Sequence, residues 1–125
     1  MSHMSTIELE VKDLDILSQA CNRMGLKLIR DQKTHKWFGS KDGICDHAIS
    51  IPGAEYEIGV TKKNGQYELN CDFYDRRLTQ AIGENGGRLK QSYAIEKTRQ
   101  AARIRGYSVT ERLNESKVQL RISIS

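Results

Sequence analysis

The chain is poor in the residue types that mark specialised protein classes. Its 125 residues include one proline, three cysteines and only 6% aromatic side chains. The composition excludes collagen-like and low-complexity chains, and no apolar run approaches the roughly 20 residues that a membrane helix needs. The N-terminus also lacks the apolar stretch of a secretory signal. We therefore predict a soluble globular protein, with a single domain over residues 1–125.

The cysteines argue against a disulfide scaffold. Cys21, Cys45 and Cys71 make an odd and low number, whereas a secreted scaffold of this size usually carries an even and denser set. We therefore favour reduced, partly buried thiols in a cytoplasmic protein.

Charge is unevenly distributed along the chain. The net charge is only +4, but residues 76–125 hold eleven Lys and Arg against four acidic residues, whereas residues 1–75 are net acidic. A basic C-terminal portion is suited to nucleic acid, an acidic protein face or another anionic surface. Alternatively, the basic portion packs on the acidic portion of the same chain.

The first third of the chain shows the periodicities of both strand and helix. Ser5–Val11 alternates apolar and polar residues, as in a half-buried strand. Asp13 is placed to cap a helix that ends at Gly25. Residues 26–30 can form a short strand, and the polar stretch 31–43 is predicted to be a loop around the only tryptophan.

Three alternating runs in the centre predict a meander of strands. They cover residues 46–51, 56–61 and 67–73, and Asn64-Gly65 between the last two is a strong signal for a two-residue hairpin turn. Such a turn pairs residues whose numbers sum to 129, and a turn at Gly53-Ala54 pairs residues that sum to 107. One face then carries the predicted core, which comprises Ile49, Ile51, Tyr56, Ile58, Val60, Leu69, Cys71 and Phe73.

The C-terminal third predicts a long helix followed by a hairpin. A helical turn is indicated around Leu78, and residues 88–105 form the longest helical pattern, stopped by Gly106. Residues 107–109 and 118–124 alternate again, with a turn at Asn114-Glu115-Ser116. The order of elements predicts an α+β fold in two layers, with an antiparallel or mixed sheet of about five to seven strands and two main helices packed on one face.

The predicted register also produces an acidic face opposite the core. Asp46, Glu57 and Asp72 lie on it, and Glu57 and Asp72 are predicted to be directly opposed. Opposed like charges destabilise a strand pair. A sheet tolerates them where the face is open to water, where basic side chains of the chain or of a partner cover it, or where a cation binds.

The long helix carries cations around much of its circumference. Nucleic-acid binding would use them to neutralise phosphates, whereas a merely solvated face is the simpler alternative. If the helix binds a partner, we expect reversal of Arg99 and Arg103 to Glu to abolish binding with little change in melting temperature. The candidate partner-binding residues are Arg88, Lys90, Lys97, Arg99, Arg103 and Arg105.

Other candidate sites are weaker. Cys45, His47 and Cys71 lack zinc-site spacing, so a structural histidine and a core thiol are favoured. His35 and Trp37, among lysines, form either an exposed ligand loop or, as we favour, a segment whose tryptophan packs over the core. The segment Gly83-Glu84-Asn85-Gly86-Gly87-Arg88 loosely resembles a phosphate-binding loop but lacks the Lys-Ser/Thr ending. We assign no catalytic residue, no metal and no cofactor.

Short motifs occur in a characteristic order along nearly the whole chain. They are the opening Met-Ser-His-Met-Ser-Thr-Ile, Met24-Gly25, Cys45-Asp46, Tyr56-Glu57-Ile58-Gly59, Gly65-Gln66-Tyr67-Glu68-Leu69 with Asp72, Tyr93-Ala94 and Gly106-Tyr107-Ser108-Val109. Together they resemble a family of small uncharacterised proteins, a domain of unknown function, found in cyanobacteria, algal plastids and phages. The loop 31–43 and the Ser-Ile-Ser ending depart from that pattern. The resemblance implies a cytoplasmic or stromal compartment and a native Met-Ser-His start, but no reaction.

Three functional hypotheses follow. The first is a small non-enzymatic binding or adaptor protein that engages a protein or nucleic acid, and no membrane, through the basic helix and the acidic face. The alternative is a nucleotide-binding or small-anion-binding regulator that uses residues 83–87 and Arg88. The third, and least favoured, is a metal-dependent enzyme that uses Asp46, Glu57 and Asp72.

Overall fold

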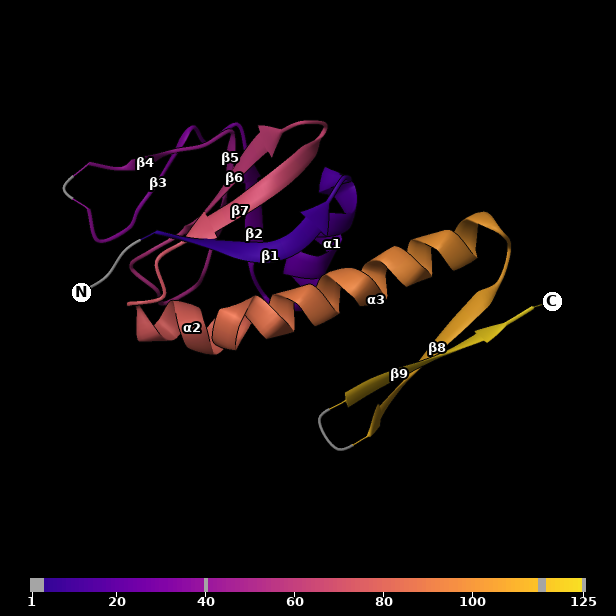
Figure 1. Cartoon of the computed structure of the whole chain (residues 1–125). Helices are drawn as coiled ribbons and strands as arrows, with labels where there is room; N and C mark the ends of the chain where they lie inside the picture. Colours follow the sequence, from indigo (N-terminus) through magenta and orange to yellow (C-terminus); the bar gives the residue numbers. More distant parts are fainter. Residues whose placement is uncertain (1–3, 40, 115–116, 125) are drawn as a thin grey trace.

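A five-stranded antiparallel sheet forms the centre of the molecule (Figure 1). The structure is a computed structural model and describes residues 4–39, 41–114 and 117–124. The strand order is β1-β7-β6-β5-β2, and the α+β architecture predicted from the sequence is confirmed. The strands span β1 (Ser5–Val11), β2 (Lys27–Arg30), β5 (His47–Ser50), β6 (Ile58–Lys63) and β7 (Gln66–Cys71).

The hairpin register agrees with the sequence prediction. Val60 pairs with Leu69, and Ile49 pairs with Ile58. The turn between β6 and β7 has positive φ at both central residues, 51° at Asn64 and 80° at Gly65. These values match the two-residue turn whose twist suits antiparallel strands. Ile58 consequently points into the core, where it is fully buried.

The strands are shorter than predicted at one end. The β6–β7 ladder stops at the pair Gly59–Asn70, so Glu57 and Asp72 lie beyond it. The prediction that these two carboxylates are directly opposed in the sheet is therefore wrong. Tyr56 and Phe73, which also lie beyond the ladder, are half-buried at the margin of the core.

Aspartates begin two of the helices. The carboxylate of Asp13 accepts hydrogen bonds from the N–H groups of Asp15, at 2.8 Å, and Ile16. Asp75 caps the second helix in the same way. No helix in the described part of the chain is long and apolar enough to cross a membrane. The helices are α1 (Leu14–Arg23), α2 (Arg76–Ile82) and α3 (Gly87–Ile104), and a short 3-10 segment (η1, Glu84–Gly86) joins the last two.

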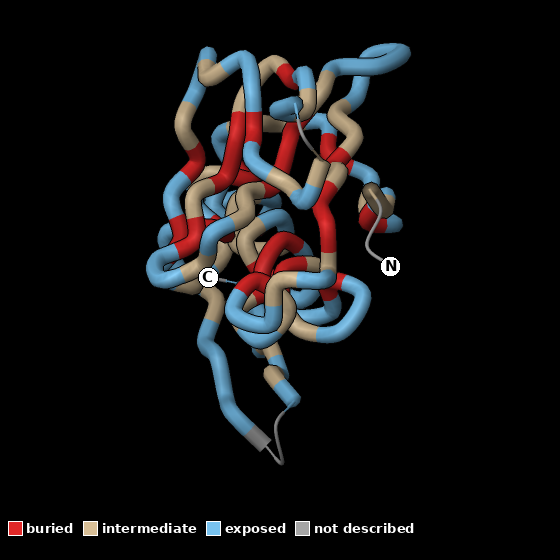
Figure 2. The backbone as a smooth tube through the Cα atoms, turned by 90° about the vertical axis from the view of Figure 1, so that its left-hand side faces the viewer, coloured by how far each residue is buried: buried red, intermediate tan, exposed pale blue. Residues whose placement is uncertain are grey.

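One face of the sheet and the helices enclose the core, which Figure 2 shows as the buried centre of the molecule. Ile58 and Val60 of β6 belong to the same buried cluster as Leu17 of α1, Leu78 of α2 and Leu89 of α3. All these side chains are fully buried. The amphipathic α1 and α3 thus supply the helical layer that the sequence pattern predicts.

The segment predicted to be a loop around Trp37 has more structure than expected. It contains two short paired strands, β3 (Thr34–His35) and β4 (Gly43–Ile44). Its contacts with the sheet include His35, which lies against Gly59 of β6. Trp37 is half-buried, and its indole N–H donates to the carbonyl oxygen of Lys41 at 2.8 Å. We call residues 31–45 the flap.

The predicted terminal hairpin forms a sheet of its own. It consists of β8 (Ser108–Asn114) and β9 (Lys117–Ser123), and it is separate from the five-stranded sheet. Of the turn predicted at 114–116, residues 115–116 lie outside the described residues, as does the Met-Ser-His start. In Figure 2 this ribbon extends from the body of the molecule and is largely exposed. It contributes no described side chain to the core cluster.

Candidate functional site

Asp72 is a structural residue rather than part of an open acidic face. Its side chain is only 1% exposed. Its carboxylate accepts hydrogen bonds from the N–H groups of Phe38, at 3.2 Å, and Tyr74, at 2.9 Å. The alternative in which the acidic face is open to water is therefore wrong at this position, because the flap covers Asp72.

The other two predicted carboxylates also accept hydrogen bonds from the backbone. Glu57 accepts from the N–H of Lys36 at 3.1 Å and from the side-chain amide of Gln32. Asp46 accepts from the N–H of Lys62 at 2.8 Å. Glu57 and Asp72 hold the flap on the sheet, and Asp46 stabilises the backbone of β6. A partner-binding role for this face stays a prediction.

The cysteines and His47 also have structural surroundings. His47 accepts a hydrogen bond from the N–H of Asp31 at 3.0 Å, and Cys45 donates its thiol to the carbonyl oxygen of Gln32. Burial raises the pKa of both Cys21 and Cys71 to about 12, so these thiols stay protonated at neutral pH. Over the described residues, no group of three or more His, Cys, Asp or Glu is placed to hold a metal ion.

Asp75 is a structural residue that the sequence analysis missed. One carboxylate oxygen caps α2 through the N–H groups of Arg77 and Leu78, and the other accepts from Glu55 and Tyr56 at 2.8 and 3.0 Å. Burial alone would raise the pKa of Asp75, but these N–H groups lower it below its ordinary value. Its position just before a helical pattern, like that of Asp13, is the signal that could have identified it.

Close packing explains two glycines of the segment between α2 and α3. A Cβ atom on Gly83 would lie 2.8 Å from the backbone nitrogen of Arg88, and one on Gly86 would lie 2.9 Å from Ile7. Both have positive φ. The guanidinium of Arg88 donates to the carbonyl oxygen of Gln80 at 3.3 Å. These contacts account for the glycines without an anion, and the anion-binding role of the segment stays a prediction.

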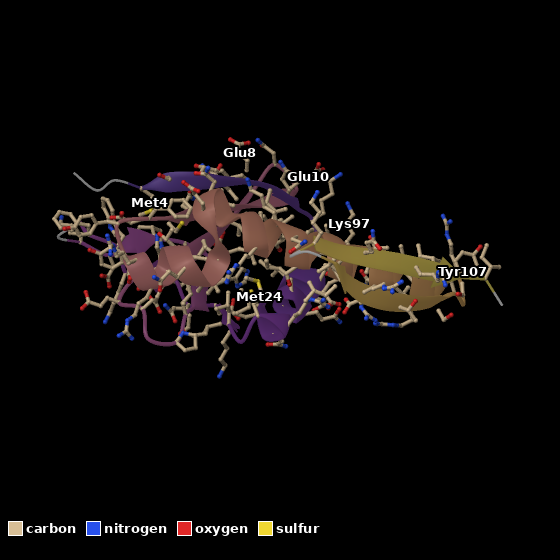
Figure 3. The ribbon with its side chains drawn as sticks, turned by 90° about the horizontal axis from the view of Figure 1, so that it is seen from below. Met4, Glu8, Glu10, Met24, Lys97 and Tyr107 are labelled. Atoms are coloured by element: carbon tan, nitrogen blue, oxygen red, sulfur yellow. The ribbon has the colours of Figure 1, made fainter. Side chains whose placement is uncertain are left out.

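The cations of α3 fall into two groups. Arg88 and Arg99 donate to other parts of the chain, and Lys90 is half-buried. Lys97, Arg103 and the C-cap residue Arg105 are exposed. Figure 3 shows Lys97 near Glu10 of β1, and its charge contributes to lowering the pKa of Glu10, after the larger effect of the hydrogen bond from Lys12.

Arg99 joins α3 to the ribbon. Its guanidinium donates to the carboxylate of Glu111 on β8 at 3.1 Å, and Arg23 of α1 pairs with the same carboxylate at 2.5 Å. The hydrogen bond from Arg23 is the main reason that the pKa of Glu111 falls to about 2, and Arg99 also lowers it. Arg99 therefore has a structural role, so its reversal is no clean test of partner binding.

The ribbon carries cations that the candidate list from the sequence omits. Its residues alternate between two faces, and Arg112 of β8 lies opposite Gln119 of β9, as Thr110 lies opposite Arg121. A groove of about 600 Å³ is lined by these four residues together with Glu111 and Leu120. Part of the signal was available, because Arg121 lies between the apolar residues Leu120 and Ile122 of an alternating run.

The end of α3 and the ribbon, residues 97–123, together form a region that we call the basic arm. Its one described acidic side chain, Glu111, pairs within the molecule with Arg23 and Arg99. Just before the arm, Glu96 pairs with Arg23 at 3.6 Å. In contrast, six exposed cations of the arm have no carboxylate within salt-bridge distance among the described residues: Lys97, Arg103, Arg105, Arg112, Lys117 and Arg121.

Comparison with known proteins places the chain in a family. Residues 20–123 match the family described as proteins of unknown function, DUF1257. The chain is also 30% identical over 118 residues to the uncharacterized protein ycf35 of Guillardia theta, a match that covers 93% of this chain and 91% of that protein. No solved structure shows significant similarity. The family resemblance inferred from the sequence motifs is thus confirmed, and the chain belongs to the DUF1257 family.

Proposed function

We propose that the protein is a non-enzymatic binding protein that engages nucleic acid through the basic arm. The observation that carries this proposal is the unbalanced charge of the arm, whose exposed arginines and lysines lack carboxylate partners among the described residues. Cations in such a position neutralise phosphates and release the counterions condensed on nucleic acid.

The chemistry of the ribbon favours nucleic acid over an acidic protein. One face presents Thr110, Arg112, Gln119 and Arg121 around a groove, so it combines positive charge with hydrogen-bond donors and acceptors. Arg and Gln side chains on such a face can also bond the base edges that duplex DNA exposes in its major groove. An acidic protein surface would require only the charge. The face that carries Asp46, Glu57 and Asp72 is not part of this surface.

The cysteines support a reducing compartment, either the cytoplasm or a plastid stroma. Cys21, Cys45 and Cys71 are all buried and unpaired. Chains that remain free of disulfides are typical of compartments that keep thiols reduced.

The proposal is tested by fluorescence anisotropy with a short labelled DNA duplex over a series of salt concentrations. With four or five phosphates neutralised, log K should fall against log[salt] with a slope of about −4. The double variant R112E/R121E should weaken binding at least tenfold and flatten the slope by about 2. Both arginines are exposed on the ribbon and away from the core.

The matched control is K27E/K41E, which changes the net charge by the same amount. Both lysines are exposed, one at the start of β2 and one on the flap. This variant should retain nearly the affinity and slope of the wild-type protein. Absence of duplex binding at low salt, or equal losses in the two double variants, contradicts the proposal.

A further inference from the structure

The outer edge of β9 is unpaired in the described chain. The ribbon has only two strands, and β9 pairs with β8 along Lys117–Ser123. β8 contacts α3, and Val118 and Ile122 of β9 line cavities with α3 residues, so one face of the ribbon is turned towards the helix. The edge of β9 away from β8 has no partner strand among the described residues. An isolated two-stranded ribbon is only marginally stable in water, and an unpaired edge is a template for another strand. The edge of β9 is therefore a candidate interaction surface.

Exposed apolar side chains are concentrated in the same region. Four of the seven large apolar side chains that are exposed in the described chain lie in the basic arm or directly after it. Leu113 is 76% exposed, Ile122 47% and Ile124 74%. Such side chains near an unpaired edge are typical of a surface that another chain covers.

The sequence of β9 is complementary to itself in one register. Val118, Leu120 and Ile122 share one face, with Leu120 at the centre. When two copies pair antiparallel about a two-fold axis through Leu120, Val118 lies opposite the second copy's Ile122. Gln119 then lies opposite Arg121, and Lys117 lies opposite Ser123. No like charges meet, and the apolar residues of both copies stay on one face.

The neighbouring registers bring like charges together. Side chains alternate between the two faces of a strand, so opposed residues of the two copies must lie on the same face. The nearest alternative registers that keep the apolar residues together therefore place the two-fold axis one residue away from Leu120. An axis through Gln119 places Lys117 opposite Arg121, and an axis through Arg121 places two copies of Arg121 together. Opposed like charges destabilise a strand pair. The charge pattern therefore selects the axis at Leu120.

We infer that β9 pairs with β9 of a second copy of this chain about a two-fold axis through Leu120. The homodimer has one continuous four-stranded sheet, in the order β8-β9-β9-β8. Such a two-fold contact uses the same surface on both subunits and closes on itself. β8 is unsuited to the same role, because an axis at its centre would oppose two copies of Glu111, which already pairs with Arg23 and Arg99.

The dimer is tested with two leucine-to-lysine variants in sedimentation equilibrium. In L120K, the new lysine lies opposite Glu111 within the chain, which is compatible with the ribbon, but opposite a second lysine across the axis. We expect the wild-type protein to sediment at twice its chain mass of 14.2 kDa and L120K at the mass of one chain. The control L113K alters an exposed leucine of β8 and should remain dimeric.

Variants with a single new cysteine in β9 test the position of the two-fold axis. Opposed residues of an antiparallel pair have Cα atoms about 4.5–5.5 Å apart, within the range of a disulfide. Under mild oxidation L120C should therefore form a covalent dimer. V118C and I122C should not, because each new cysteine lies four residues along the strand, about 13 Å, from the same position in the second copy. The native cysteines are buried and do not compete.

A monomeric wild-type protein, a dimeric L120K, or equal cross-linking by L120C and V118C overturns the inference. These outcomes are separate from the test of nucleic-acid binding. A monomer that binds duplex DNA contradicts only the dimer, whereas a dimer that does not bind contradicts only the proposed function. R112E/R121E should remain dimeric, because position 121 faces Gln119 across the axis.

Discussion

The imidazole of His35 lies between the backbones of two glycines. A Cβ atom on Gly43 would lie 2.4 Å from the ring, and one on Gly59 would lie 2.5 Å from it. The side chain is 3% exposed, and neither ring nitrogen has a hydrogen-bond partner among the described residues. The flap is therefore docked on the sheet through a neutral ring, and both glycines are needed for its close approach.

The first prediction concerns the pH dependence that His35 produces. Burial lowers the pKa of His35 below its ordinary 6.5, although Glu57 and Asp42 oppose this shift. The unfolded chain thus binds a proton more readily, and stability falls as the pH drops below 6.5 until the lowered pKa is reached. H35F keeps a flat ring without the titration, so the free energy of unfolding in urea should vary less over this interval. An unchanged pH dependence contradicts the assignment.

The second prediction compares the two capping aspartates. Asp13 caps α1 with two N–H groups, whereas Asp75 caps α2 and also accepts from Glu55 and Tyr56. D13A should cost about 1 kcal/mol of unfolding free energy. D75A should cost about 2–4 kcal/mol, because two further backbone donors lose their acceptor. Equal losses in urea denaturation would show that the contacts with Glu55 and Tyr56 contribute nothing.

At the scale of elements, local signals could be predicted and contacts between distant segments could not. The Asn64-Gly65 turn determines its register through neighbouring residues, and the prediction was confirmed. The flap was predicted as a loop, because its docking depends on Gly59 and Glu57, which lie more than ten residues beyond it. Likewise, the helix pattern placed Arg99 among the binding residues but did not reveal its partner on the following strand.

The third prediction is that Glu111 holds the ribbon against the helices. E111Q removes the charge that Arg23 and Arg99 share, so amide hydrogen exchange in residues 108–123 should accelerate while the five-stranded sheet stays protected. Because the pKa of Glu111 falls from 4.5 to about 2, its contribution is fully present above pH 4.5 and is lost as the pH drops to about 2. E96Q, which alters only the 3.6 Å contact with Arg23, is the control. Equal exchange in the two variants contradicts this role.

At the scale of the whole molecule, the core and the unbalanced positive charge lie in different parts of the chain. The buried core cluster draws its members from Ile7 to Tyr93, whereas the exposed cations of the arm without a salt bridge to a described residue begin beyond it at Lys97. Figure 1 shows the ribbon alongside the C-terminal part of α3, away from the five-stranded sheet. The body is thus stabilised by apolar burial, and the arm is available for the proposed interactions.

This separation predicts that a chain ending at Tyr107 folds without the ribbon. The truncation keeps the hydrogen bond from the N–H of Tyr107 to the carbonyl oxygen of Ala102, at 2.8 Å, which closes the end of α3. It uncovers Ile95 and Met24, which line a cavity with Val118. The melting temperature should therefore fall by several degrees, which corresponds to a loss of about 1 kcal/mol in the free energy of unfolding. Circular dichroism should still show one cooperative transition, while duplex binding and dimerisation are both lost. An unfolded truncated chain would instead mean that the ribbon is part of the folding unit, and the division between a stabilising body and a binding arm would then be wrong.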